Sequence, residues 1–116
     1  MAMMAHNLFL KIISKEIPAK IVYEDDLCLA FHDVGPKAPI HVLVIPKKEI
    51  RTHADVTDDD KLLLGHLHTV AATLAVKLGL ADGYRLVINC GEQGGQSVPH
   101  LHMHLMGGRD FGWPPG

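Results

Sequence analysis

The sequence has few of the features that mark specialised protein classes. It contains only two cysteines, Cys28 and Cys90, and they form no C-x-x-C pair. A disulfide framework is therefore excluded, and a reducing compartment is favoured. No apolar run approaches the roughly 20 residues of a membrane span, and the apolar run at 8–13 is interrupted by Lys11, unlike a signal peptide. We expect a cytoplasmic protein that the nucleus can also admit, with no membrane partner.

The chain also lacks an excess of charge. Its net charge is −2 with histidine neutral, whereas general binders of nucleic acid or anionic membranes need a basic surface. We therefore expect no nucleic-acid partner. With 47% apolar and 21% charged residues, the composition is that of a globular protein. We predict one domain over residues 1–116, with a flexible N-terminus at 1–6 and a C-terminal tail at 107–116.

Hydrophobic periodicity predicts an α+β fold with more strands than helices. A long helix is expected at 58–78, with Thr57 as its N-cap and Gly79 as its stop, and a short helix at 8–16 ends before Pro18. Alternating patterns predict strands at 21–24, 27–33, 41–45, 84–89 and 100–106. Close neighbours in sequence suggest an antiparallel sheet of about five strands. On the long helix, His66 and His68 are expected to face solvent.

The segment 100–106 is the most informative part of the sequence. Three histidines, His100, His102 and His104, alternate with apolar residues. On a strand this pattern gives one apolar face and one face with imidazoles whose Cα atoms are roughly 6.5–7 Å apart. Two chemistries use such a row. One is metal binding, and the other is nucleophilic attack on phosphorus. Composition does not choose between them.

The glycine-rich turn before the histidines suggests an anion site. Gly95, Gln96 and Ser97 lead directly into the row, and such a turn can aim backbone N–H groups and a hydroxyl at a phosphate. A flexible hairpin loop is the alternative reading of the same residues. Asp33, which follows the apolar Phe31, could accept sugar hydroxyls or simply end its strand.

The row and its neighbours resemble a known family. His100-x-His102-x-His104 followed by Leu105-Met106 is similar to the His-φ-His-φ-His-φ-φ motif of the histidine triad (HIT) superfamily, where φ is apolar. Blocks at 15–20, 28–33, 44–48, 94–98 and 113–116 resemble its Hint branch of purine nucleoside phosphoramidases and protein kinase C-interacting proteins. The resemblance extends over about residues 8–116. It implies a HIT-like fold whose sheet continues across a homodimer.

The resemblance also implies a mechanism. His102 would attack the phosphorus of a purine nucleoside 5′-phosphoramidate, such as AMP joined to an amine or a lysine, and form a nucleotidyl-histidine that water hydrolyses. His104 would bind the phosphate oxygens, Ser97 would assist the departing amine, and His41 and His100 would fix the tautomers. No metal or cofactor takes part. Crowding should oppose simultaneous protonation of the neighbouring rings.

Substrate-binding roles follow from the same resemblance. Asp33 would accept the ribose hydroxyls, and Asn89 would contact the phosphate or the leaving group. Gly95 and Gln96 would belong to the anion-binding turn. The base would lie among apolar side chains, namely Leu8, Phe9, Ile17, Phe31, Val34 and Leu43. Core packing alone would also explain Ile17, Phe31 and Leu43, and a backbone partner alone would explain His41.

The sequence departs from the family pattern in two places. Pro99 precedes the histidines where the branch generally has an aromatic residue, which alters the loop that carries Ser97. Asn7-Leu8-Phe9-Leu10 replaces the C-x-x-C that binds zinc in some bacterial relatives, so no metal site is predicted. In the implied homodimer, Trp113 reaches the partner's site. The alternatives are a dinucleotide polyphosphate hydrolase and a nucleotide-binding adaptor for signalling proteins.

Overall fold

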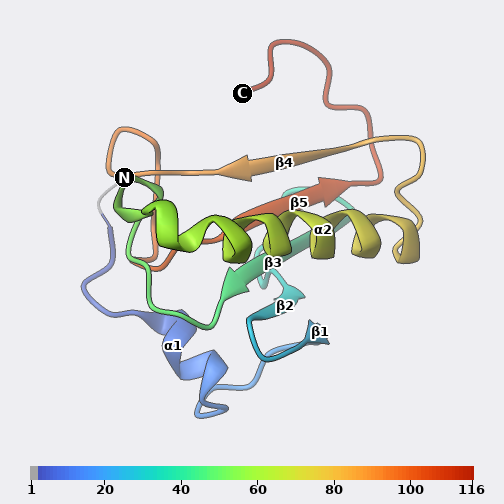
Figure 1. Cartoon of the computed structure of the whole chain (residues 1–116). Helices are drawn as coiled ribbons and strands as arrows, with labels where there is room; N and C mark the ends of the chain where they lie inside the picture. The colour runs from blue at the N-terminus through green and yellow to red at the C-terminus, as the bar shows by residue number, and fades with distance from the viewer. Residues whose placement is uncertain (1–2) are drawn as a thin grey trace.

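Five antiparallel strands form one open sheet, in the order β1-β2-β3-β5-β4 (Figure 1). The computed structural model describes residues 3–116. The elements, in chain order, are α1 (Leu8–Ile13), β1 (Ile21–Glu24), β2 (Cys28–His32), β3 (Ile40–Pro46), α2 (Lys61–Lys77), β4 (Tyr84–Ile88) and β5 (Met103–Gly107). This arrangement confirms the predicted α+β fold with one long and one short helix.

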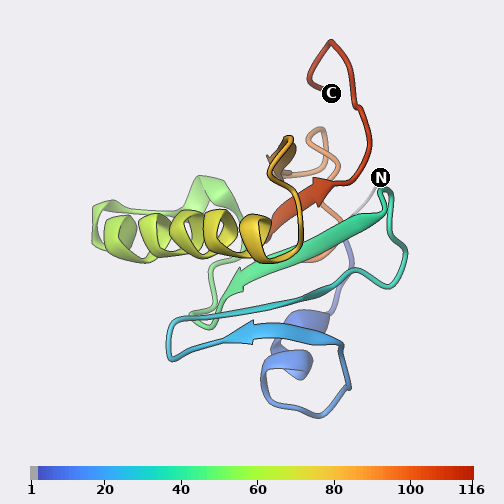
Figure 2. The same cartoon turned by 90° about the vertical axis from the view of Figure 1, so that its right-hand side faces the viewer.

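Helix α2 lies along one face of the sheet (Figure 2). The predicted stripe brings Leu67, Val70 and Leu74 into the main hydrophobic core, together with the inward residues of β2, β3 and β5. The helix begins three residues later than predicted, because Asp58–Asp60 form a 3₁₀ turn. Thr57, predicted as the N-cap of the long helix, caps this turn instead, and the N-cap of α2 is Asp60. The Thr57 hydroxyl accepts from the Asp59 N–H, and the Thr57 N–H donates to the Asp60 carboxylate.

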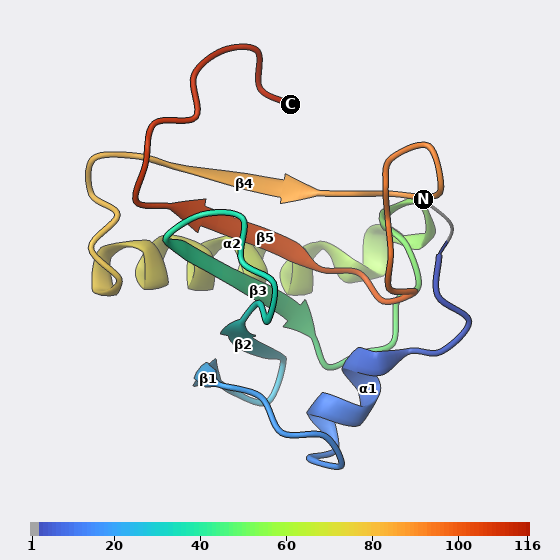
Figure 3. The same ribbon diagram turned by 180° about the vertical axis from the view of Figure 1, so that it is seen from behind.

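Helix α1 covers part of the opposite face (Figure 3), where a smaller hydrophobic cluster forms. Phe9 and Ile12 of α1 pack there against the other set of side chains from β2 and β3, which include Leu29, Phe31 and Leu43. The prediction of a helix over 8–16 is wrong at its end. Lys15 has a φ of +68°, and a left-handed residue cannot continue an α-helix.

The predicted histidine strand is shorter than expected. Strand β5 begins only at Met103, and the preceding residues follow an irregular path in which the Leu101 N–H donates to the Ile50 carbonyl. The predicted alternation of faces nevertheless holds. The apolar members lie in the core beneath α2, namely Leu101, Met103 and Leu105.

The predicted flexible segment 1–6 is only partly within the described residues, since 1–2 lie outside them. Within it, the Met4 N–H donates to the Ser97 carbonyl at 2.6 Å, so this end of the chain is tied to the loop before the histidines. Among residues 3–116, no helix is both long and apolar enough to cross a membrane.

Candidate active site

A hydrogen bond between His41 and His104 fixes the tautomers of both rings. Strand β3 pairs with β5 so that Leu43 lies opposite His104, which puts His41 on the same face of the sheet. The Lys37 backbone N–H donates to Nδ1 of His41 at 3.0 Å, so a neutral His41 carries its proton on Nε2. This Nε2–H donates to Nδ1 of His104 at 2.9 Å. His104 then carries its own proton on Nε2, as a donor for an anionic oxygen.

His102 has the opposite tautomer. Its Nδ1–H donates to the backbone carbonyl of His100 at 2.7 Å, so a neutral ring has its lone pair on Nε2. The ring centroids of His102 and His104 are 5.0 Å apart, and the ring of Phe9 packs edge-on against His102 at 5.0 Å. A nucleophilic nitrogen and an N–H donor therefore lie side by side.

His100 is held on both sides and serves as a support. Its Nε2–H donates to the Pro46 carbonyl at 2.8 Å, and its Nδ1 accepts from the Asn7 side-chain amide at 2.9 Å. Sequence reasoning missed Asn7, although an asparagine directly before an apolar helix is typical of an N-cap. Asn7 does cap α1, because its Oδ1 accepts from the Leu10 N–H. One side chain thus connects helix α1 to the first histidine.

All four imidazoles are kept neutral near pH 7. Burial holds the pKa of His41, His100 and His102 below the ordinary value of 6.5. For His104, burial acts together with the neighbouring His102 and His41 and lowers the pKa to about 4. The sequence predicted crowding as the cause, whereas burial is the larger effect. Neutral rings are what a histidine nucleophile requires.

A pocket of about 750 Å³ opens beside His41, and Asp33 lies in its wall. One Asp33 oxygen is 3.5 Å from Nε2 of His41, and the other accepts from the Gly35 N–H at 2.8 Å. His32, which strand alternation turns away from Asp33, lines the same pocket. The predicted ribose-binding acid is thus placed next to the histidine row.

The family assignment follows from this geometry and from comparison with known proteins. A family model described as the HIT domain matches residues 14–111, which include all three histidines of the row. The chain belongs to the HIT family.

Relatives in sequence and in structure match this chain over most of its length. An uncharacterized HIT-like protein of Synechococcus elongatus is 57% identical over 110 residues, which make up 95% of this chain and 96% of that protein. A HIT family hydrolase from Legionella pneumophila has a TM-score of 0.93 at 53% identity, covering 96% of this chain and 100% of that one. A histidine triad nucleotide-binding protein from Candida albicans has a TM-score of 0.80 at 32% identity, covering 94% and 83%.

The structure gives two residues of the glycine-rich turn a different role from the predicted one. The backbone N–H groups of Gly95 and Gln96 already donate to Glu92 and Gly91 within the turn. The Gln96 side chain is 1% exposed. Its oxygen accepts from the Gly91 N–H, and its nitrogen donates to the Arg51 and Val98 carbonyls. Both residues therefore shape the loop and offer no spare donor to a phosphate.

Ser97 and Asn89 stay at the edge of the site. Ser97 is half-buried, and its backbone carbonyl is the partner of Met4. Asn89 follows β4, and its side-chain amide donates to the Gly94 carbonyl at 2.7 Å. The Asn89 amide thus ties β4 to the turn, and its role toward substrate stays a prediction.

The predicted base-binding residues fall into two groups. Phe9, Phe31 and Leu43 are each 4% exposed, so they form the packed support of the site and present little surface to a base. Leu8 and Ile17 are partly buried against the same cluster. Val34 is fully exposed beside Asp33, where it lines the pocket.

The C-terminal tail lies away from the histidines of its own chain. Trp113 is 88% exposed. The Arg85 guanidinium donates to the carbonyls of Gly112 and Pro114 and stacks on the ring of Phe111. The tail is therefore anchored on β4, one of the two edge strands of the sheet.

One group in the site could in principle hold a metal ion. Ligand atoms of Asp33, His41 and His104 lie within 4.8 Å of one another. In the structure the His41 and His104 nitrogens are hydrogen-bonded to each other at 2.9 Å. A metal would have to break the hydrogen bond that fixes both tautomers.

Proposed function

We propose that this HIT protein is a hydrolase of purine nucleoside 5′-phosphoramidates, with His102 as the nucleophile. The observation that carries the proposal is the opposite tautomers of two neighbouring rings. The His100 carbonyl holds the His102 proton on Nδ1, while His41 leaves the His104 proton on Nε2. One ring can attack phosphorus while the other binds the oxygens that gain charge.

The reaction takes two displacements. Nε2 of His102 attacks phosphorus in line, a P–N bond to histidine forms, and the P–N bond to the amine breaks. The amine nitrogen takes one proton from solvent by way of the Ser97 hydroxyl and leaves as a neutral amine. Water then attacks phosphorus, the P–N bond to His102 breaks, and the proton that water loses returns to solvent, so that the nucleoside monophosphate and neutral His102 are released. The His100 carbonyl stabilises the positive charge on the ring between the two steps.

Asp33 supports the choice of a nucleotide as substrate. One of its oxygens is used by Gly35, and the other faces the pocket near His41. A carboxylate in this position can accept hydrogen bonds from both hydroxyls of a ribose. The name of the Candida relative, a nucleotide-binding protein, agrees with this assignment.

A homodimer is part of the proposal. Strand β4 lies at the edge of the sheet and exposes Tyr84 and Leu86, while α2 exposes Leu62 and Val76. An open edge beside exposed apolar side chains is suited to isologous pairing that continues the sheet. Trp113, exposed at the end of a tail anchored on β4, would then reach the partner's site.

The test is steady-state hydrolysis of an adenosine 5′-phosphoramidate with a fluorescent amine, in the presence of EDTA. We expect turnover by the wild type and a loss of at least about 10³-fold in His102→Ala, because the variant has no nucleophile. His68→Ala is the matched control, since His68 is exposed on α2. Absence of turnover by folded wild type that still binds AMP would contradict the proposal and favour a nucleotide-binding adaptor.

A second substrate distinguishes the proposed activity from that of a dinucleotide polyphosphate hydrolase. We expect the phosphoramidate to be hydrolysed faster than a dinucleotide polyphosphate, and Ser97→Ala to slow the former by about 10²-fold or more if its hydroxyl aids the amine. The reverse preference, with Ser97→Ala unaffected, would identify a dinucleotide polyphosphate hydrolase.

A further inference from the structure

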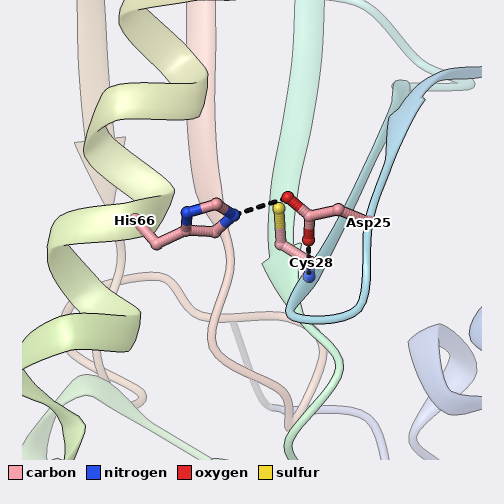
Figure 4. A group of neighbouring side chains, drawn as sticks. All are labelled: Asp25, Cys28 and His66. Atoms are coloured by element: carbon pink, nitrogen blue, oxygen red, sulfur yellow. Dashed lines mark hydrogen bonds and ion pairs between the residues drawn. The ribbon is translucent and has the colours of Figure 1, made fainter.

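A second cluster of reactive side chains lies on the α2 side of the sheet, away from the histidine row. It consists of Asp25, Cys28 and His66 (Figure 4). Asp25 lies in the turn after β1, Cys28 begins β2, and His66 projects from α2 toward that turn. Nε2 of His66 is 2.5 Å from an Asp25 oxygen. The expectation that His66 faces solvent is therefore wrong, because its ring reaches from α2 to the turn between β1 and β2.

The ligand atoms of these three side chains are close enough to share one ion. The His66 nitrogen, the Cys28 sulfur and an Asp25 oxygen all lie within 4.8 Å of one another. Three ligands placed about 2.0–2.3 Å from a tetrahedral zinc ion would be roughly 3.3–3.8 Å apart. To reach that geometry the His66 nitrogen and the Asp25 oxygen, now 2.5 Å apart, would separate by about 1 Å as the ion replaces the proton between them.

We propose that Asp25, Cys28 and His66 form a binding site for Zn²⁺ or a similar transition-metal ion. Thiolate, imidazole and carboxylate are the three protein ligand types that zinc prefers. The fourth position would be taken by water. Asp25 and His66 are each exposed over about a quarter of the side chain, and His66 and Tyr23 line a small surface pocket of about 210 Å³.

The hydrogen bonds of the cluster show how an ion would be accommodated. The Asp25 carboxylate accepts from the Tyr23 hydroxyl at 2.7 Å, from the His66 ring, and from the backbone N–H groups of Leu27 and Cys28. Burial works against its charge, yet the hydrogen bonds hold the pKa of the Asp25 carboxyl well below its usual range. The carboxylate is thus charged, and the His66 proton is the one that a cation bound between these side chains would replace.

Metal binding at this site would release one proton and leave no net charge. Cys28 is fully buried, and its thiol would release one proton on binding the ion as a thiolate. The His66 proton moves to Nδ1 through solvent and frees Nε2 as a ligand. A dication with one thiolate and one carboxylate is neutral overall, which suits a half-buried position.

Direct metal binding tests the proposal without reference to enzymatic activity. We expect equilibrium dialysis of the full chain against Zn²⁺ to find an ion whose binding is weakened more than about 100-fold by His66→Gln. Loss of a mere supporting hydrogen bond weakens a metal site by about 10–100-fold. Glutamine can still donate to Asp25, so the variant keeps the link between helix and hairpin. His68→Gln is the matched control, exposed on the same helix, and should bind as the wild type does.

A competing location is the group of Asp33, His41 and His104 on the other face. His104→Ala removes a ligand there and leaves the proposed site intact. Zinc binding that survives His104→Ala supports the proposal. Binding that His104→Ala abolishes and His66→Gln leaves unchanged, or no binding by the wild type, overturns it.

Cobalt substitution identifies the thiolate ligand in the folded wild type. Co²⁺ bound to a cysteine gives a sulfur-to-metal charge-transfer band in the near ultraviolet. We expect this band in the wild type and in Cys90→Ala, and its absence in Cys28→Ala. A band that depends on Cys90, or bound Co²⁺ with no such band, would overturn the assignment of Cys28.

Discussion

The two faces of the sheet bury different chemistry. Toward α2, strands β2, β3 and β5 bury apolar side chains and a cysteine, and six of them are 2% exposed or less, namely Cys28, Ala30, Val42, Val44, Met103 and Leu105. Toward α1, the same strands and the segment before β5 present aromatic and aliphatic groups together with imidazoles. His41, His100 and His102 are 5% exposed or less. The two kinds of burial alternate residue by residue along one chain.

The difference shows that one face of the sheet mainly stabilises the fold and the other carries the reactive side chains. Burying an imidazole is unfavourable unless its polar atoms find partners. Here the partners include two backbone carbonyls and a backbone N–H, those of Pro46, His100 and Lys37. The apolar face therefore stabilises the fold, while the imidazole face uses part of that stability to hold neutral rings in defined tautomers.

The largest expected effect is on the apolar face. Leu105 is fully buried beneath α2, so Leu105→Ala should lower the free energy of unfolding by about 2–5 kcal/mol. Turnover per folded molecule at low temperature should change little, because the side chain does not contact the site. Urea denaturation and active-site titration measure the two quantities. An equal loss of activity in the folded fraction would contradict the separation of the two faces.

The adjacent residue on the other face should behave in the opposite way. His104→Ala removes the N–H donor for the phosphate and should lower kcat by about 10²–10³-fold. Its effect on unfolding should be smaller than that of Leu105→Ala, because a partly buried imidazole is replaced by an apolar group. The two neighbours form a matched pair in one strand. A larger stability loss in His104→Ala would break the comparison.

Substitutions of His41 test whether its hydrogen bond to His104 sets the tautomer of His104. His41→Ala removes the donor to Nδ1 of His104 and should lower kcat by about 10–100-fold, the range for supporting groups at catalytic centres. His41→Gln offers an amide donor in the same direction and should recover part of the loss. A role in packing alone predicts no such recovery, and also predicts an unchanged pH profile in His41→Ala.

Acid should lower the free energy of unfolding through protonation of His104. The pKa of His104 is about 4 in the folded chain against an ordinary value of 6.5. Between these values the unfolded chain binds more protons, so the free energy of unfolding falls as pH is lowered through this window. Urea denaturation from pH 7.5 to pH 4.5 measures the slope, which His104→Ala should reduce. An unchanged slope in that variant would show that other groups are responsible.

Local patterns predicted most of the fold because hydrophobic periodicity reports directly on which side of an element is buried. The five strands lie where alternation placed them, and the stripe on α2 predicted its buried side. Errors occurred at the ends of elements, as at Lys15 and Met103. There a single backbone angle or a neighbouring loop determines where the helix or strand stops or starts. The histidine row itself was predicted from three residues and their spacing.

By itself, the sequence determined the fold class, the histidine row and the family, because periodicity and motif spacing are local properties of the chain. Only the tertiary structure decided which groups hold those histidines. Asn7 reaches His100 across 93 residues, and His66 reaches Asp25 across 41. The tertiary structure also buries the Gln96 side chain inside its loop, where its amide donates to the Val98 carbonyl. Such contacts depend on the register of strands and the crossing of a helix, which bring together side chains that no local pattern connects.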